Sequence, residues 1–183
     1  VHGTQNETTS ALNAKVDGLY DVTGVFGGGN ASDYVPDAAD KKQSTEVIIE
    51  GCDLTSIEEV YGGGYGAATP GTNVLIKGTK IIDNVYGGGY GACTDNPGAN
   101  VGFRTGGASY TSGDGKAVVQ LMAGKVNNVY GGSNTKGDIL NGASVTNVAN
   151  DGGPGCCTEL SVDEIYGGGK NADMYGGAEI CLS

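Results

Sequence analysis

Acidic residues recur in front of an aromatic residue, and paired carboxylates are the groups with which an enzyme cleaves polysaccharides. Glu58, Asp83 and Asp163 each stand three residues before a tyrosine, but Thr23 and Asn127 hold the equivalent positions of two further copies. We therefore expect no catalytic residue and keep a polysaccharide-active enzyme as the alternative. The other acidic residues of these stretches are Asp53, Glu59 and Glu164.

No basic residue recurs together with these acids. His2 is the only histidine and Arg104 the only arginine, so catalytic triads that need a positioned imidazole are excluded. The glycines at 62–66 lack the lysine and the following helix of a phosphate-binding loop. The net charge of −11 disfavours nucleic acid as a partner, and no apolar run is long enough for membrane insertion.

Five cysteines occur without CxxC spacing or nearby histidines, which argues against zinc. In an extracellular setting they predict two disulfides and one remaining thiol, with small buried hydrophobic residues as the alternative. The disulfide candidates are Cys52, Cys93, Cys156, Cys157 and Cys181.

Three aspartates share one stretch, and carboxylates are ligands that Ca²⁺ prefers. The spacing of Asp33, Asp37 and Asp40 matches neither an EF-hand nor a calcium-binding repeat, so we interpret them as surface charge. We expect no metal and no cofactor, and keep Ca²⁺ as the alternative. Asn6 and Asn30 begin glycosylation sequons that suit exposed loops.

One sequence motif recurs along most of the chain. It consists of an aliphatic residue, two variable residues, a second aliphatic residue, an aromatic residue and then glycines. Spacings between the aromatic residues are 35, 25, 44, 36 and 9 residues, the last leading to a degenerate copy. The aromatic residues are Phe26, Tyr61, Tyr86, Tyr130, Tyr166 and Tyr175. The corner glycines are Gly27, Gly28, Gly62, Gly63, Gly87, Gly88, Gly131, Gly132, Gly167 and Gly168.

Short alternating stretches precede most copies and predict strands with one buried face. They lie at residues 47–49, 74–76, 119–121 and 160–162. Glycine density disfavours helix, because each interior glycine costs about 1 kcal/mol. Such units bury their apolar faces only when they are stacked, so we expect an all-β parallel β-helix of about five to six irregular coils. Its aromatic residues should form a ladder, and its corner glycines should allow positive φ at a corner and close approach of successive coils.

Three longer segments follow glycine corners, at residues 30–44, 93–116 and 133–157, and we expect them to form insertions on one side of the solenoid. This loop face could bind glycans or a partner chain, with ordinary solvated loops as the alternative. Its candidate binding residues are Asp33, Tyr34, Asp37, Asp40, Phe103, Arg104, Tyr110 and Asp114. Ice binding would need a regular outward threonine array, which Thr45, Thr55, Thr72 and Thr79 do not form.

Residues 74–89 and 119–132 combine strand, glycine turn and Val-Tyr-Gly-Gly corner. They resemble the glycine-rich β-helix repeats of large adhesin-like surface proteins of bacteria. The resemblance covers roughly residues 14–183 and implies right-handed coils and a secreted or surface-displayed, filament-forming protein, with no catalytic residues.

The domain organisation that we expect is an N-terminal extension at 1–14 and a single solenoid domain at 15–183, as a segment of a longer protein. The extension would serve as a cap or as a strand donated to a neighbour. The last residues, 178–183, are expected to form a strand with nothing after it. Self-association through open ends is therefore the expected partnership, in an extracellular or cell-surface setting.

Overall fold

The computed structural model describes residues 2–5, 12–16, 20–36, 44–91, 98–102, 115–150 and 158–183. Its elements are β1 (His2–Gln5), β2 (Leu12–Val16), β3 (Tyr20–Phe26), β4 (Thr45–Glu50), η1 (Cys52–Leu54), β5 (Thr55–Tyr61), β6 (Thr72–Gly78), β7 (Ile81–Tyr86), β8 (Ala117–Leu121), β9 (Gly124–Tyr130), β10 (Ala143–Asn147), β11 (Leu160–Tyr166) and β12 (Ala178–Cys181). Within these ranges the only helical element is the three-residue 3-10 turn η1, so the expected all-β class is confirmed for the described chain.

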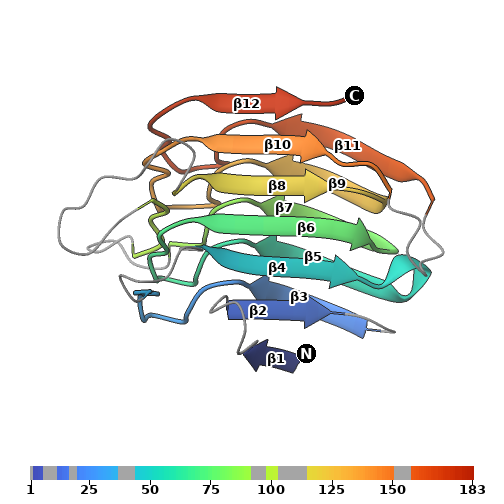
Figure 1. Cartoon of the computed structure of the whole chain (residues 1–183), viewed down its shortest axis with the longest axis horizontal. Helices are drawn as coiled ribbons and strands as arrows, with labels where there is room; N and C mark the ends of the chain where they lie inside the picture. Colours follow the sequence, from blue (N-terminus) through green and yellow to red (C-terminus); the bar gives the residue numbers. More distant parts are fainter. Residues whose placement is uncertain are drawn as a thin grey trace.

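The strands form two sheets with parallel pairing (Figure 1). Sheet A has the order β1-β2-β4-β6-β8-β10-β12, and sheet B has the order β11-β9-β7-β5-β3. Only β1 runs antiparallel to its neighbour, β2. It lies at the edge of sheet A, within the segment that we expected to act as a cap. Parallel sheets built from successive units are compatible with a β-helix.

The chain alternates between the two sheets, and one strand of each sheet with the glycine corner that follows forms a unit. The connection from sheet A to sheet B is short; only Thr79 and Lys80 separate β6 from β7. The return from sheet B passes the glycines and a segment paired through isolated bridges, such as Val101 with Ile139 and Ile139 with Met174. The described parts of successive units therefore pair both within the sheets and in the segments that return from sheet B to sheet A.

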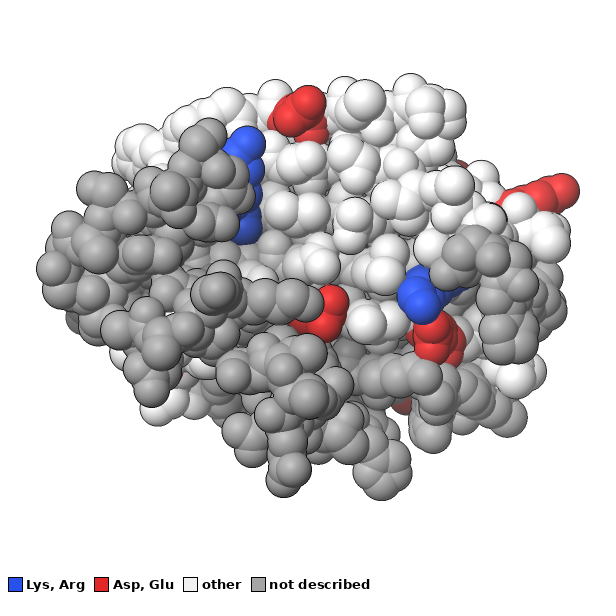
Figure 2. Space-filling view, viewed as in Figure 1, with Lys and Arg blue, Asp and Glu red and all other residues white. Residues whose placement is uncertain are grey.

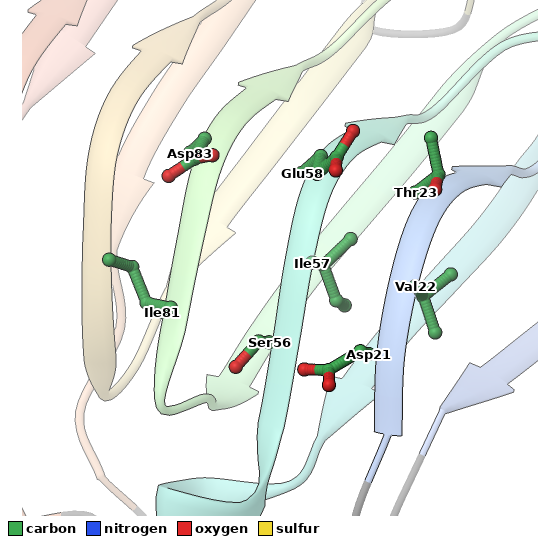
Figure 3. A pocket seen from close by; sticks show the side chains of 8 residues that line it. All are labelled: Asp21, Val22, Thr23, Ser56, Ile57, Glu58, Ile81 and Asp83. Atoms are coloured by element: carbon green, nitrogen blue, oxygen red, sulfur yellow. The ribbon is translucent and has the colours of Figure 1, made fainter.

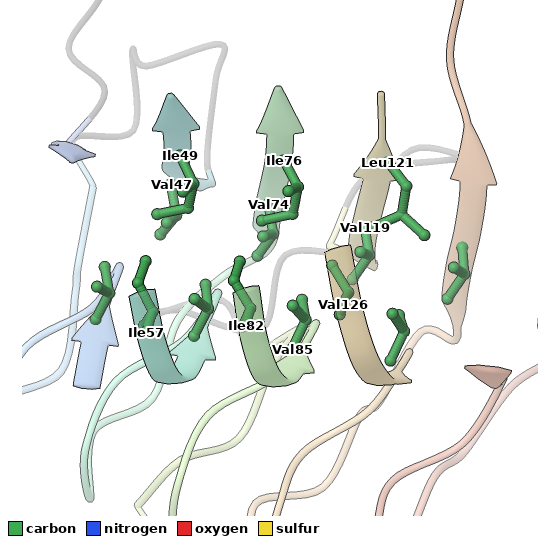
Figure 4. Close-up of a cluster of buried hydrophobic side chains, with 14 residues drawn as sticks. Val47, Ile49, Ile57, Val74, Ile76, Ile82, Val85, Val119, Leu121 and Val126 are labelled. Carbon is green, nitrogen blue, oxygen red and sulfur yellow. The ribbon is translucent and has the colours of Figure 1, made fainter. Parts of the chain in front are cut away.

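Aliphatic side chains fill the space between the sheets (Figure 4). Strand β4 alternates buried and half-exposed residues, and its inward Val47 pairs in register with Val74, which in turn pairs with Val119. Ile57 and Ile82 are aligned in the same way in sheet B. Each such buried side chain contributes about 1.5–3 kcal/mol through removal from water.

The buried threonines connect this core to the corners. Thr45 and Thr72 donate from their hydroxyls to the carbonyl oxygens of Gly62 and Gly87, both over 2.5 Å. Thr79 donates to the carbonyl oxygen of Thr55 over 2.9 Å. These side chains are buried rather than displayed, in agreement with the expected lack of an outward threonine array.

Two expectations about strands and insertions were wrong. Within residues 133–150, Ser133 is buried, Ile139 is bridged on both sides, and β10 belongs to sheet A, where it pairs with β8 and β12. The third predicted insertion therefore does not begin at Ser133. Strand β10 was missed because its sequence, ASVTN, has a single strongly apolar residue. The stretch at 160–162 is part of β11 itself rather than a strand preceding it.

Charge is sparse over the outer face of sheet A (Figure 2). Outward positions on its central strands include Leu75, Val118 and Gln120, whereas Lys77 pairs with Glu50 over 2.9 Å near the strand ends. None of the described helical residues forms a segment with the length and hydropathy to cross a membrane.

Candidate functional site

Five aromatic rings from successive units form one stack. The ring centroids of Phe26 and Tyr61 lie 4.6 Å apart, and those of Tyr61 and Tyr86 lie 4.8 Å apart. Tyr130 continues the stack at 5.1 Å from Tyr86, and Tyr166 follows at 5.0 Å from Tyr130. Interplanar angles between 4° and 11° show that the rings lie nearly parallel, in the order that the repeat predicted.

Tyr175 lies outside this stack, contrary to the expected six-member ladder. Tyr175 follows Met174, which forms a bridge with Ile139 in the segment that connects sheet B back to sheet A. The backbone amide of Tyr175 donates a hydrogen bond to the carbonyl oxygen of Ile139 over 2.7 Å. The degenerate copy is therefore not a corner. The same Tyr-Gly-Gly sequence occurs here at a different position in the unit, directly before β12 instead of directly after a sheet B strand.

A second aromatic pair was not anticipated. Tyr65 and Tyr90 stack at 5.1 Å, and their rings meet Phe26 and Tyr61 edge-on at 5.8 Å and 6.0 Å. Edge-to-face and offset-stacked contacts of this kind add about 0.5–1.5 kcal/mol each beyond burial. The signal was present in the sequence, because each of the two residues stands four positions after a ladder tyrosine.

The phenols of the stack differ in their hydrogen bonding. Tyr61 donates to the Glu59 carboxylate over 2.7 Å and accepts from the Asn134 amide over 2.8 Å. Burial, with the bond to Glu59, raises the pKa of Tyr61 well above its usual range. The hydroxyl of Tyr86 is buried and has no partner among the described residues, and burial raises the pKa of Tyr86 likewise. The stack therefore contains one satisfied and one unsatisfied buried phenol.

The first corner glycine of each unit contacts the backbone of the next unit. A Cβ on Gly27 would lie 2.3 Å from the carbonyl oxygen of Gly62, and one on Gly62 would lie 2.4 Å from that of Gly87. The same clash would follow at Gly87 and Gly131, at 2.2 Å and 2.4 Å. Close approach thus explains these glycines. None of the ten corner glycines uses the positive φ that glycine allows, and the left-handed glycines of the described residues lie elsewhere, for example at Gly142.

Two of the repeated acids, Glu58 and Asp83, line an open groove on sheet B (Figure 3). Its volume is about 250 Å³, and its lining includes Glu58, Asp83 and Asp21. Asp83 accepts a hydrogen bond from the Asn127 amide over 3.0 Å, so this carboxylate is engaged along the sheet. No lysine or arginine lines the groove, and no described group of three or more carboxylate, cysteine or histidine side chains is arranged to hold a metal ion. Asp163 continues the same row on β11, whereas Asp53 lies in η1.

Of the candidate binding residues on the expected loop face, only Asp33 and Tyr34 lie among the described residues. The Asp33 carboxylate accepts from the amide of Ala68 over 2.8 Å, and the amide of Tyr34 donates to the carbonyl of Ala68 over 3.0 Å. Asp33 therefore connects two units. The other binding candidates, Asp37, Asp40, Phe103, Arg104, Tyr110 and Asp114, lie outside the described residues.

Two of the five cysteines can be placed. Cys52 is half-buried in η1, and Cys181 is exposed at the end of β12; the two are not bonded to each other. Cys93, Cys156, Cys157 and the sequon residue Asn6 lie outside the described residues, and Asn30 is exposed. The disulfide pairing stays a prediction.

Apolar side chains are exposed on the last described strands of the two sheets, β11 and β12. Tyr166, the last ring of the stack, is 43% exposed, and Ile180 and Leu182 are 45% and 55% exposed. Gly168 has no atom within 4 Å of its Cβ position, although the equivalent position on Gly132 would lie 2.6 Å from the amide nitrogen of Gly169. Side chains that would be covered within the stack thus face solvent here. These exposed apolar side chains on β11 and β12 are the candidate interaction site.

No family model, curated protein or solved structure matches this chain.

Proposed function

We propose that this chain is an extracellular structural module, a right-handed parallel β-helix of five to six coils that associates with copies of itself into a filament or surface assembly. The regular pairing of successive units supports the solenoid. The aromatic stack and the contacts between corner glycines give each unit the same interface with the next, which is the design of a scaffold rather than of a catalytic site.

Exposed apolar side chains on β11 and β12 are the observation that supports self-association. Exposed strand edges with apolar side chains are places where sheets pair with other chains. Tyr166 of β11, Ile180 of β12 and Leu182 are exposed side chains of this kind. The acidic groove has no basic partner, which favours a structural role over polysaccharide cleavage.

Electron microscopy and sedimentation velocity of the purified chain test this function. Rods or oligomers that grow with protein concentration are expected. Dispersed monomers at high concentration would contradict self-association. A high-resolution map of the assembly would fix handedness and coil number.

Carbohydrate binding is the second candidate, favoured by the exposed ring of Tyr65. This ring is 41% exposed beside Tyr90, and flat aromatic surfaces of this kind can pack against sugar rings. Binding on a glycan array that is lost in Tyr65→Ala and kept in Tyr175→Ala, another exposed tyrosine, would support this candidate. Absence of any glycan binding would dismiss it.

A further inference from the structure

The aromatic rings of the stack follow one another without interruption across five units. Neighbouring centroids between Phe26 and Tyr166 lie 4.6–5.1 Å apart, and neighbouring rings lie within 11° of parallel. Tyrosine is a side chain that can give one electron to a strong oxidant, and electron transfer between two side chains is fastest when their rings are in van der Waals contact. The geometry therefore allows an electron to move from ring to ring along the stack.

The second aromatic pair connects the buried part of this stack to the surface. Tyr61 is fully buried, whereas Tyr65 is 41% exposed. Tyr65 stacks on Tyr90 at 5.1 Å, and the Tyr90 ring meets that of Tyr61 edge-on at 6.0 Å. Tyr65 also contacts Phe26, at 5.8 Å, but phenylalanine is much harder to oxidise than tyrosine. Tyr65 and Tyr90 thus form a path of oxidisable rings from solvent to Tyr61.

Tyr61 has the proton acceptor that oxidation of a phenol requires. A phenol that loses an electron becomes a strong acid, so its proton must move to a nearby base. The Tyr61 hydroxyl donates to the Glu59 carboxylate over 2.7 Å, which is short enough for direct proton transfer. The Asn134 amide donates to the same phenol oxygen over 2.8 Å and holds it in place. Burial raises the pKa of Tyr61, so this side chain is a neutral phenol until it is oxidised.

Tyr86, the next ring of the stack, has no such acceptor. Its hydroxyl is buried without a partner among the described residues. Asn84 takes the position, two residues before the ring, that Glu59 takes before Tyr61. The side-chain oxygen of Asn84 accepts from the Asn128 amide over 3.2 Å, and an uncharged amide is not a base that takes a phenol proton. Tyr86 can therefore pass an electron but cannot release its proton to a carboxylate.

We propose that Tyr61 and Glu59 form a redox site, which a one-electron oxidant in the surrounding solution reaches through Tyr65 and Tyr90. The oxidant takes one electron from Tyr65, and the phenol proton of Tyr65 passes to water. Tyr61 then gives one electron through the Tyr90 ring to the Tyr65 radical, which regains a proton from water. The phenol proton of Tyr61 moves to Glu59. The products are the reduced oxidant and a neutral tyrosyl radical on Tyr61, beside the carboxylic acid of Glu59.

The surroundings of this pair favour its oxidised form. Before oxidation the partly buried pair carries one negative charge, and afterwards it carries none. Loss of charge is favourable where solvation is poor. Phe26 and Tyr86 stack on the two faces of the Tyr61 ring, so radicals and reductants in solution do not reach it. Each copy of the chain contains the whole site, whether or not copies associate.

One further stack tyrosine has a carboxylate partner, and the experiment has to remove it. Tyr166 donates to Glu164 over 2.6 Å and is 43% exposed. All proteins in the test therefore carry Tyr166→Phe, because phenylalanine keeps the stacked ring, as Phe26 does beside Tyr61. Tyr61 is then the only stack tyrosine that donates to a described carboxylate.

Flash photolysis tests the site, with a ruthenium tris-bipyridine photo-oxidant and a cobalt(III) ammine as the electron acceptor. Absorption of the tyrosyl radical should decay in a fast phase from exposed tyrosines and a slow phase from Tyr61. Glu59→Gln should shorten the slow phase at least tenfold, because glutamine accepts the hydrogen bond but not the proton. Glu58→Gln, the matched control on the same strand, should keep the slow phase. Tyr61→Phe should abolish it.

Absence of a slow phase from the parent protein would overturn the site, and so would equal lifetimes in Glu59→Gln and Glu58→Gln. Persistence of the slow phase in Tyr61→Phe would overturn it too. Circular dichroism checks that each variant keeps its sheets. If Tyr61→Phe loses its sheets, the two glutamine variants decide, since both keep the size of the side chain.

The path from the surface is tested separately. Tyr90→Phe keeps a ring between Tyr65 and Tyr61 but removes the oxidisable phenol, so the slow phase should appear later. Tyr175→Phe is the control, because Tyr175 is exposed and lies outside the stack, and it should cause no delay. A slow phase that appears equally early in both variants would overturn the path through Tyr90.

Discussion

The phenols of Tyr61 and Tyr86 occupy adjacent places in one stack but have opposite energetic roles. Tyr61 links Glu59 and Asn134, whereas the Tyr86 hydroxyl is buried without a described partner. Removing one member of a buried hydrogen-bonded pair leaves the other buried without a hydrogen bond, which costs free energy. Removing a polar group that already lacks a partner removes the cost of burying it. Tyr61→Phe should therefore destabilise the fold by about 1–2 kcal/mol, and Tyr86→Phe should be neutral or stabilising by up to about 1 kcal/mol.

Urea unfolding followed by circular dichroism measures both variants, and each serves as the control for the other because the same atom is removed from the same stack. Equal destabilisation by the two substitutions would contradict the assigned hydrogen bonds.

At the residue scale, the sequence predicted where the aromatic side chains lie but not which partner a polar side chain contacts. Ring stacking of Phe26 and the four ladder tyrosines followed from the repeat, because equivalent residues of stacked units must align. The engagement of Asp33 with Ala68 did not follow, since that partner lies 35 residues away in another unit. A carboxylate can bind a ligand or accept a hydrogen bond from a neighbouring unit. Which of the two it does depends on the backbone amides close to it in space, and the sequence does not reveal where these lie.

At the scale of the elements, the corner glycines differ in what they touch, although their local sequence is the same. A Cβ on Gly87 would lie 2.2 Å from the Gly131 carbonyl oxygen, whereas one on Gly168 would meet no atom within 4 Å. Gly87→Ala should cost about 1–3 kcal/mol or more through forced backbone movement. Gly168→Ala should change the free energy of unfolding by less than about 0.5 kcal/mol.

Thermal unfolding of both variants, at a protein concentration below that of self-association, gives the comparison. A Gly168→Ala variant as unstable as Gly87→Ala would mean that the corner requires glycine for its backbone conformation and not for close approach.

Strands were predicted correctly where apolar and polar residues alternate in the sequence. The prediction failed where pairing with neighbouring strands, and not such a pattern, holds a segment in the sheet. The stretches at 47–49, 74–76 and 119–121 became β4, β6 and β8. Strand β10 contains only Val145 and Ala143 as inward apolar residues, and parallel neighbours on both sides hold it in the sheet. The residues of β10 alone therefore do not predict a strand, because its conformation depends on pairing with β8 and β12.

At the scale of the whole molecule, the buried phenols predict loss of stability in alkali. The pKa values of Tyr61 and Tyr86 are raised in the fold above the value of about 10 in an unfolded chain. The folded state thus holds these protons more tightly, so their contribution to stability is fully present below about pH 10 and is lost as the pH rises further.

The free energy of unfolding should therefore fall above about pH 10, and tyrosinate absorbance of the buried rings should appear together with loss of the sheet signal. A variant with both Tyr61→Phe and Tyr86→Phe should lose less stability over this pH range. Full tyrosine ionisation with intact sheets would show that these phenols are accessible to solvent in the fold.

The contact between corner glycines also bears on how such a chain can change its length. The neighbour of each first corner glycine is the corresponding glycine of the next unit, from Gly27 through Gly62, Gly87 and Gly131 to Gly167. The requirement is identical at every level, so duplicating or deleting a complete unit re-creates the same contacts. Replacing a single glycine does not. Gene-level gain or loss of whole units is consequently a milder change for this architecture than one point substitution at a corner.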